Sequence, residues 1–336
     1  MIDLKSNYPN LDRLIDFVRN DAEELSHLPL SPDGRYQTRA VTLEQLTEEV
    51  TRCLAGGFAG KSADEFPALY CSWGKCRVGS TALTNLFGVA GLLSYYQPVK
   101  TIARHRLLGN EPVSWDLPSP SESPEIYTKE MAGPYLIAET LFNPLKCLIN
   151  AGYPASKLRL LVLDRNPYKS LASWLLKWSD KLPTNTLVEH FVLSSLNAHR
   201  MKKYAKENEI PVTHFVYEAS RKPAEAIQRL FKRLGLSSYY HAGVVDNWDE
   251  MGALASEKSR IIFPDEPPIY VVPGLHSSET KYLYKDRDAS MLTSEQREIV
   301  RQTGLLELYA ESVRSCISNL ELDNDFCREA LNEELI

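Results

Sequence analysis

The fold is decided by one stretch of the sequence, Pro67-Ala-Leu-Tyr-Cys-Ser-Trp-Gly-Lys-Cys-Arg-Val-Gly-Ser-Thr81. Its first six residues form a short apolar run that is typical of a buried strand. A loop with glycines at Gly74 and Gly79 follows, and the pattern then predicts a helix from about Ser80 to Tyr95. Glycines let successive backbone amides turn into one concavity, and a helix N-terminus adds partial positive charge. The stretch therefore predicts a phosphate-binding loop, with a purely structural strand-to-helix turn as the alternative.

Strands and helices alternate through the rest of the chain. Leu158–Asp164 is a near-continuous apolar run of the kind found in parallel sheets, and Ile126–Lys129 and Pro211–Tyr217 are two further expected strands. Helices are expected over residues 142–151, from Asn166-Pro167 onward, where proline suits the first helical position, and over residues 222–234. This alternation predicts an α/β fold with a parallel, doubly wound sheet flanked by helices.

The first 60 residues are expected to form a helical N-terminal extension apart from the core. Leu11, Leu14, Ile15 and Val18 repeat at helical spacing, and Thr42 begins a second helix with a capping-box pattern. Residues 61–336 then form a single α/β domain. Within it, the proline- and serine-rich residues 110–125 predict a long loop that shapes a substrate site.

The composition limits the function classes. The chain has 336 residues, of which 43% are apolar and 24% charged, as in ordinary globular proteins. Its charge sum is 38 − 44 = −6, and without a long basic block a nucleic-acid partner is not expected. No stretch is apolar enough to span a membrane, and no N-terminal signal segment is evident, so we expect no membrane association and a cytoplasmic location. The six cysteines show no disulfide framework.

The loop departs from the nucleotide-triphosphatase pattern G-x-x-x-x-G-K-[ST], because Ser80 stands where that pattern has lysine. This departure disfavours a magnesium-dependent kinase, and Lys75 and Arg77 are the cations that can replace the missing charge. A second anion-binding pair follows the strongest strand. Arg165 stands at its carboxyl end, where α/β sheets bind ligands, and Ser173 lies about two helical turns further on. Both side chains can reach one anion if the helix starts beside it. The alternative is that Arg165 is a surface salt-bridge partner and Ser173 an ordinary helix hydroxyl.

Taken together, these segments resemble the sulfotransferases that use 3′-phosphoadenosine-5′-phosphosulfate (PAPS), over roughly residues 67–235. The family motif [KR]-x-G-[ST]-T, which grips the 5′-phosphosulfate, stands here as Arg77 to Thr81. The family motif R-[ND]-P with a serine eight positions after the arginine stands as Arg165 to Ser173. A tyrosine that lies near the adenine corresponds to Tyr217, followed by Glu218. The resemblance implies a P-loop-like sulfotransferase fold.

The resemblance also implies a set of nucleotide-binding residues. The family's late 3′-phosphate loop has no clean copy, and the best candidate is the segment 255–260, with Lys281 or Lys285 as alternatives. The expected cofactor-binding residues are Lys75, Arg77, Val78, Gly79, Ser80, Thr81, Ala82, Arg165, Ser173, Tyr217, Lys258 and Arg260.

Transfer of the sulfuryl group requires a residue that contacts the leaving oxygen and a base for the acceptor's proton. Arg77 is expected at the leaving oxygen. On the strand that carries the family's K-x-H segment, Lys129 matches the lysine and Met131 replaces the histidine, so Glu130 is the nearest base. His105 is a second candidate, and Asp116 and Glu139 are rivals.

The function implied is sulfuryl transfer from PAPS to a hydroxyl group, or to an amine or carbamoyl nitrogen, of a small molecule, with release of 3′,5′-ADP (PAP). Residues 129–144 resemble bacterial natural-product members, which suggests a cationic acceptor such as an alkaloid toxin. No metal is expected, and the chain is expected to be a monomer or homodimer. Two alternatives stay open, a small-molecule kinase that uses Mg-ATP and a non-catalytic nucleotide-binding protein.

Overall fold

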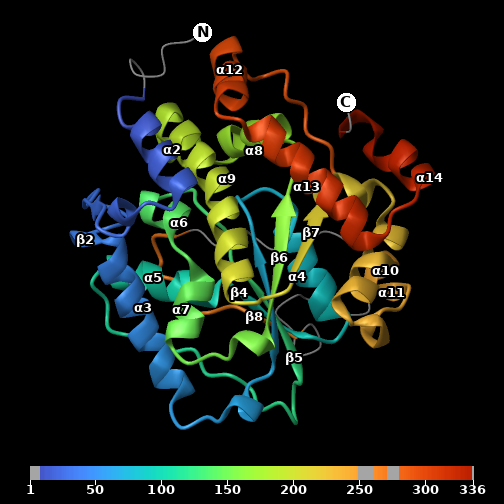
Figure 1. The fold of residues 1–336 in the computed structure, drawn as a ribbon, viewed down its shortest axis with the longest axis horizontal. Helices are drawn as coiled ribbons and strands as arrows, with labels where there is room; N and C mark the ends of the chain where they lie inside the picture. Colours follow the sequence, from blue (N-terminus) through green and yellow to red (C-terminus); the bar gives the residue numbers. More distant parts are fainter. Residues whose placement is uncertain (1–7, 249–259, 271–279, 335–336) are drawn as a thin grey trace.

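The computed structural model describes residues 8–248, 260–270 and 280–334, and its centre is a six-stranded sheet (Figure 1). All neighbouring strands are parallel, so their carboxyl ends meet at one edge. In sheet order the strands are β7 (Val212–Val216), β6 (Leu158–Asp164), β3 (Ala68–Trp73), β5 (Glu125–Lys129), β4 (Leu93–Tyr96) and β8 (Ile261–Ile262). The prediction of an α/β fold with a parallel sheet flanked by helices is confirmed.

Side chains of the central strands alternate between two hydrophobic clusters, one on each face of the sheet. Leu160 and Val162 of β6 join one cluster, whereas Leu161 and Leu163 join the other. The first face is covered mainly by α3, α7 and α9, and the second by α4, α10 and α13 (Figure 1). Burial on both faces explains the near-continuous apolar run of this strand.

The helices that cover the sheet vary widely in length, and a short antiparallel pair of strands lies beside the start of α3. The helices are α2 (Leu11–Asn20), α3 (Leu43–Phe58), α4 (Ser80–Val89), α5 (Pro98–Leu107), α6 (Ile137–Leu141), α7 (Pro144–Asn150), α8 (Pro167–Trp178), α9 (Thr184–Glu207), α10 (Pro223–Leu234), α11 (Gly243–Asp246), α12 (Ser294–Gln302), α13 (Leu305–Leu320) and α14 (Asn324–Phe326). The short pair comprises β1 (Pro29–Leu30) and β2 (Val41–Thr42).

Two expected helices have different bounds in the structure. The helix expected from Ser80 to Tyr95 ends at Val89, and its last residues form β4 instead, because Gly91 takes a left-handed conformation (φ +99°) that stops a helix. The helix expected over residues 142–151 corresponds to α7, which covers only residues 144–150, and the separate short helix α6 ends just before that range. Asn143 caps α7 by accepting a hydrogen bond from the Lys146 amide (3.0 Å), and Pro144 occupies its first position.

The sequence pattern suggested that the N-terminal helices lie apart from the core. In the structure they are part of it. Leu14 and Val18 of α2 and Leu54 of α3 belong to the same hydrophobic cluster as the strands β3 and β6. Thr42 and Gln45 form the expected capping box at the start of α3. Amphipathic helices of this length are marginal alone, and burying their apolar face against α5, α7 and α9 completes the core.

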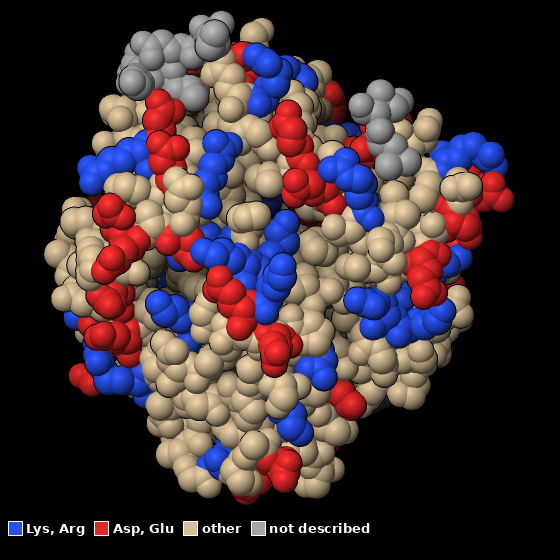
Figure 2. Space-filling model, viewed as in Figure 1, with Lys and Arg blue, Asp and Glu red and all other residues tan. Residues whose placement is uncertain are grey.

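No helix in the described ranges is long and apolar enough to cross a bilayer. All six cysteines are free thiols. On the face shown in Figure 2, basic and acidic side chains are interspersed rather than gathered in one patch of a single sign.

The place of the N-terminal helices in the core predicts a large cost for truncating one of their buried side chains. Leu54→Ala is expected to lower the free energy of unfolding by about 2–5 kcal/mol, because it leaves a cavity in the main cluster. Arg52→Ala on the exposed side of the same helix is the control, with a change within about 0.5 kcal/mol. Chemical denaturation measures both. Equal stability of the two variants would show that this helix is not part of the cooperative core.

Candidate functional site

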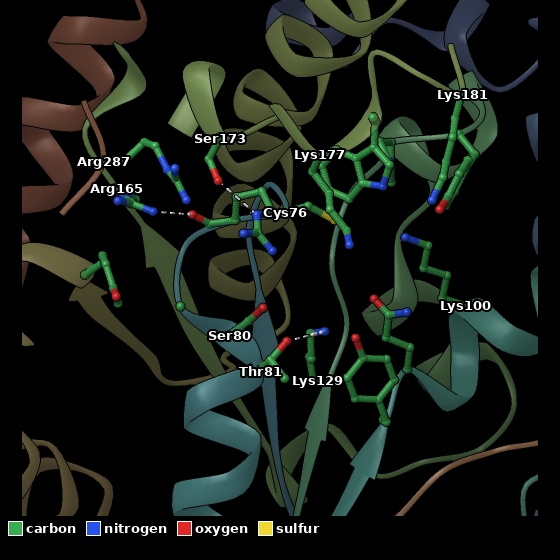
Figure 3. A pocket seen from close by; sticks show the side chains of 18 of the residues that line it. Cys76, Ser80, Thr81, Lys100, Lys129, Arg165, Ser173, Lys177, Lys181 and Arg287 are labelled. Carbon is green, nitrogen blue, oxygen red and sulfur yellow. Dashed lines mark hydrogen bonds between the residues drawn. The ribbon is translucent and has the colours of Figure 1, made fainter. Parts of the chain in front are cut away.

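A cavity of about 1040 Å³, counting its open mouth, lies at the carboxyl ends of the central strands (Figure 3). Its wall is strongly basic although the whole chain is acidic. Nine cationic side chains line it, against a single carboxylate, Glu266, among the described residues. The cations are Arg77, Lys100, Arg104, Lys129, Arg165, Lys177, Lys181, Lys285 and Arg287. A concave site with this charge balance fits a polyanionic ligand.

Two glycines of the predicted phosphate loop are required by close approaches. A Cβ atom at Gly74 would lie 2.2 Å from the carbonyl oxygen of Leu163, because the loop crosses the end of β6 there. Gly79 has a left-handed backbone (φ +80°), and a Cβ atom would lie 2.4 Å from the ring of Tyr217. The loop is therefore held against two neighbouring strands of the sheet.

The backbone of this loop offers unpaired hydrogen-bond donors. Within the described chain, the amides of residues 77–82 have no backbone acceptor, whereas the Cys76 amide donates to the Ala132 carbonyl (3.2 Å). Residues 80–82 form the first turn of α4, whose N-terminus carries partial positive charge. Ser80 and Thr81 line the cavity. The predicted loop thus has the geometry of an anion cradle.

Arg77 lies at the centre of the basic wall and is held in place by two contacts. Its Nε donates to Ser173 Oγ (2.9 Å), and its carbonyl oxygen accepts from Arg165 (3.2 Å). Its backbone is left-handed (φ +71°), a conformation that is uncommon for a residue with a side chain. Burial, together with the like charges of Arg165 and Arg287, lowers the pKa of Arg77. A bound anion would relieve this repulsion.

Arg165 contacts three separate segments around the cavity. Its guanidinium donates to the carbonyl oxygens of Arg77 and Lys285 (3.1 Å to the latter) and lies 4.6 Å from the centre of the Tyr217 ring. Its Nε is buried without a hydrogen-bond partner among the described residues. Buried donors are rarely left unpaired, so this atom indicates a missing acceptor such as a ligand oxygen.

Tyr217, at the end of β7, forms an aromatic side of the cavity. Its ring lies against Gly79 and Arg165 and 5.0 Å from the ring of Tyr284. Its hydroxyl accepts a hydrogen bond from the Lys285 amide (2.8 Å). The structure thus brings together the three motifs at Arg77, Arg165 and Tyr217 that the sequence analysis singled out separately.

The late segment that completes the wall is 284–287. Lys285, one of the expected alternatives, lines the cavity, and so does Arg287, which the sequence analysis missed. An ion pair between Lys169 of α8 and Asp286 (3.0 Å) fixes the segment. In the sequence, the alternating charges of residues 285–287 directly after Tyr282 and Tyr284 could have indicated that this segment lines a charged site.

The preferred late segment is not found at this site. Lys258 lies outside the described residues. Arg260 is described, and it donates to the Ser123 hydroxyl (2.9 Å) next to the amino ends of β5 and β8, the edge of the sheet opposite to the cavity. The structure therefore does not bring Arg260 together with Arg165.

Lys129, at the end of β5, lies between the phosphate loop and Tyr96. Its Nζ is 3.4 Å from Thr81 Oγ1 and 3.7 Å from the centre of the Tyr96 ring (Figure 3). Complete burial lowers the pKa of Lys129 to about 7. This amine therefore changes its charge near neutral pH, and an anion beside it would keep it protonated.

Besides Arg260, three of the predicted binding residues that the structure describes do not line the cavity. Lys75 turns away to form a buried ion pair with Asp164, and Val78 is buried in the hydrophobic cluster on the α4 face. Ala82 packs against the same cluster, so only its amide is available to a ligand. Lys75 thus anchors the loop to β6 rather than adding charge to the wall.

The residues predicted as bases are placed elsewhere. Glu130 is fully buried and accepts hydrogen bonds from the Val99 and Lys100 amides (2.9 and 3.1 Å), so it caps α5, and burial raises its pKa to about 8. His105 is bonded to the Asp265 carbonyl (2.8 Å). Of the two rivals, Asp116 lies beside α3, and Glu139 forms ion pairs with Arg104 and Lys100. None of these four side chains lines the cavity.

Several lining residues were missed in the sequence analysis. Glu266 comes from a distant segment with no motif and accepts hydrogen bonds from Thr101 and Arg104. Lys177 and Lys181 follow Ser173 at intervals of four residues, which places them along one side of α8 and the turn after it. That spacing was a readable signal of a shared surface.

A comparison of two glycine variants tests the approach of Tyr217 to the loop. Gly79→Ala and Gly60→Ala introduce a Cβ atom at almost the same backbone angle (φ +80° and +78°), but Gly60 has open space around it. We expect Gly79→Ala to be the more destabilising variant, by at least about 1 kcal/mol, because the collision is added to a similar backbone strain. Urea denaturation measures the difference, and equal effects would mean that Tyr217 does not close on the loop.

No protein-family model matches the chain, and the curated proteins and solved structures likewise yield no significant match.

Proposed function

We propose that the protein transfers a sulfuryl group from PAPS to a small-molecule acceptor. One observation carries the proposal: the three motifs at Arg77, Arg165 and Tyr217 converge on one cavity with nine cationic side chains. A nucleotide with phosphates on both its 3′ and 5′ positions presents charge at two separated points, which suits a wall with cations at both. The unpaired Arg165 Nε and the open loop amides supply donors for such a ligand.

In this proposal each end of the nucleotide has its own set of residues. The amides of residues 77–82, together with Ser80 and Thr81, would hold the 5′-phosphate. Arg165, Ser173 and Arg287 lie together on one side of the loop and would hold the 3′-phosphate (Figure 3). The ring of Tyr217 would lie near the adenine.

PAPS would supply a sulfuryl group that is bound to the 5′-phosphate through a bridging oxygen. When the sulfuryl group is transferred, the bond to this oxygen breaks and the nucleotide leaves with negative charge on it. Cations fixed before the reaction stabilise such charge without reorganisation. Arg77 is fixed by Ser173 and by its strained backbone, and Lys129 is fixed between Thr81 and Tyr96. Both side chains are therefore assigned to the developing charge. The acceptor would enter from the side of Lys177 and Trp178.

The proposal predicts that PAP stabilises the folded protein. A ligand that binds only the folded state adds about 2.7 kcal/mol at a hundredfold excess over its dissociation constant. Arg287→Ala is expected to lose most of the PAP-induced thermal shift, since it removes a cation next to Arg77 and Arg165. Arg159→Ala, at the opposite end of β6, is the control and should keep the shift.

Mg-ATP is titrated in parallel with PAP. A thermal shift with Mg-ATP and none with PAP would reject the sulfotransferase proposal and favour a kinase. PAP binding without turnover on any acceptor would leave a nucleotide-binding protein.

Proton uptake tests the assignment of Lys129. At pH 8 the amine, with its pKa of about 7, is mostly neutral in the free protein, and a phosphate beside it raises that pKa. PAP binding at pH 8 is therefore expected to take up a fraction of a proton, whereas the phosphates themselves are already deprotonated. Calorimetry in two buffers of different ionisation enthalpy measures this fraction.

Lys129→Arg provides the matched variant, because arginine keeps the positive charge at every accessible pH. It should bind PAP while taking up much less proton than the wild type. Uptake that is unchanged in Lys129→Arg would show that another group titrates and would remove Lys129 from the phosphate site.

A further inference from the structure

The cavity has a second charged end that the nucleotide motifs do not use. In Figure 3, Arg165, Ser173 and Arg287 lie to one side of Cys76, whereas Lys100, Lys177 and Lys181 lie to the other. Tyr135 and Trp178 line the same cavity, and their rings are in edge contact with 6.4 Å between centroids. This end therefore combines two aromatic rings with a group of cations.

Two of the cations at this end are neutralised by the protein. Arg104 forms ion pairs with Glu139 (2.6 Å) and Glu266 (3.0 Å). Lys100 is buried, lies 3.6 Å from Glu139 and donates to the Met131 carbonyl (2.9 Å). Two carboxylates thus balance two cations, and both side chains are held rigidly.

The other two cations have no such balance. Lys177 and Lys181 form no ion pair and no side-chain hydrogen bond with any residue in the described ranges. Both face the cavity, Lys177 from the last turn of α8 and Lys181 from the turn after it (Figure 3). The local surplus of about two positive charges is thus left for a ligand. It persists with the nucleotide in place, because the phosphates have their own cations on the other side of Cys76.

We infer that this end binds the acceptor and that the acceptor is an anion: a planar small molecule that carries a carboxylate or phosphate as well as the oxygen that is sulfated. The inference rests on the proposed function. Tyr135 and Trp178 would contact the planar part, and Lys177 and Lys181 the anionic group. A cationic acceptor, as the resemblance to natural-product enzymes suggested, would meet like charge here and would be disfavoured.

Three phenols that differ in the charge of one substituent provide the probes. They are 4-hydroxyphenylacetate (anionic), 4-hydroxyphenethyl alcohol (neutral) and tyramine (cationic), each titrated into the PAP-saturated protein by calorimetry in low salt. We expect the anion to bind at least tenfold more tightly than tyramine, with the neutral phenol between them. Added salt should weaken the anion's binding, because exposed lysines are screened.

The double variant Lys177→Gln/Lys181→Gln should lower the affinity for the anionic phenol at least fivefold and leave the affinity for PAP unchanged. Lys202→Gln/Lys206→Gln is the matched control, since these lysines have the same spacing on α9 and do not line the cavity. That control should alter neither affinity.

The outcomes separate this inference from the proposed function. Absence of PAP binding rejects the nucleotide site, and the order of the three phenols is then read on the free protein. If PAP binds but tyramine or the neutral phenol binds most tightly, or none of the three binds, the inference of an anionic acceptor is overturned. The same holds if the double variant binds the anion as the wild type does.

Discussion

The rest of the site depends on the interactions of the Arg165 guanidinium group. It joins the phosphate loop through the Arg77 carbonyl, the late segment through the Lys285 carbonyl, and the end of β7 through the ring of Tyr217. Because β6 lies beside both β3 and β7 in the parallel sheet, the carboxyl end of this one strand is within reach of all three segments. The Arg165 side chain thus links three segments of the cavity wall that come from different parts of the chain. Its Nε has no hydrogen-bond partner among the described residues and is available to a ligand oxygen.

The same arrangement concentrates charge of one sign, which is unfavourable in the absence of a ligand. Arg165 and Arg287 both repel the charge of Arg77, and burial lowers the pKa of Lys129 to about 7. The protein balances part of the charge with its own carboxylates, through the pair of Lys75 with Asp164 and the contacts of Arg104 with Glu139 and Glu266. What remains unbalanced lies on the two sides of Cys76. In our proposal the unbalanced positive charge on one side binds the nucleotide, and that on the other side binds the acceptor. Anion binding relieves the repulsion between the cations of the free protein, and this relief adds to the affinity.

Local patterns in the sequence were sufficient for the parts of the fold that depend on local chemistry. The strand Leu158–Asp164, the proline at the start of α8 and the capping box at Thr42 all agree with the structure. The placements of Arg77, Arg165, Ser173 and Tyr217 around one cavity follow from strand ends in a parallel sheet.

The predictions that were wrong concern residues whose position depends on tertiary contacts. Glu130 reads as an available base, yet the helix that follows β4 turns its amides onto that carboxylate. The sequence pattern suggested that Lys75 adds positive charge to the loop, but its side chain forms an ion pair with Asp164 and points away from the cavity. Glu266 carries no motif, and Arg287 lies outside residues 67–235, which the family resemblance covers. Both line the cavity because of the path of the late chain.

A crystal structure of the protein grown with PAP tests the central claim most directly. The account predicts one PAP molecule in the cavity, with its 5′-phosphate on the amides of residues 77–82 and its 3′-phosphate in contact with Arg165, Ser173 and Arg287. The adenine should lie near Tyr217. A nucleotide bound elsewhere, a reversed orientation that places the 3′-phosphate at Lys177 and Lys181, or a cavity without PAP at millimolar concentration would contradict it.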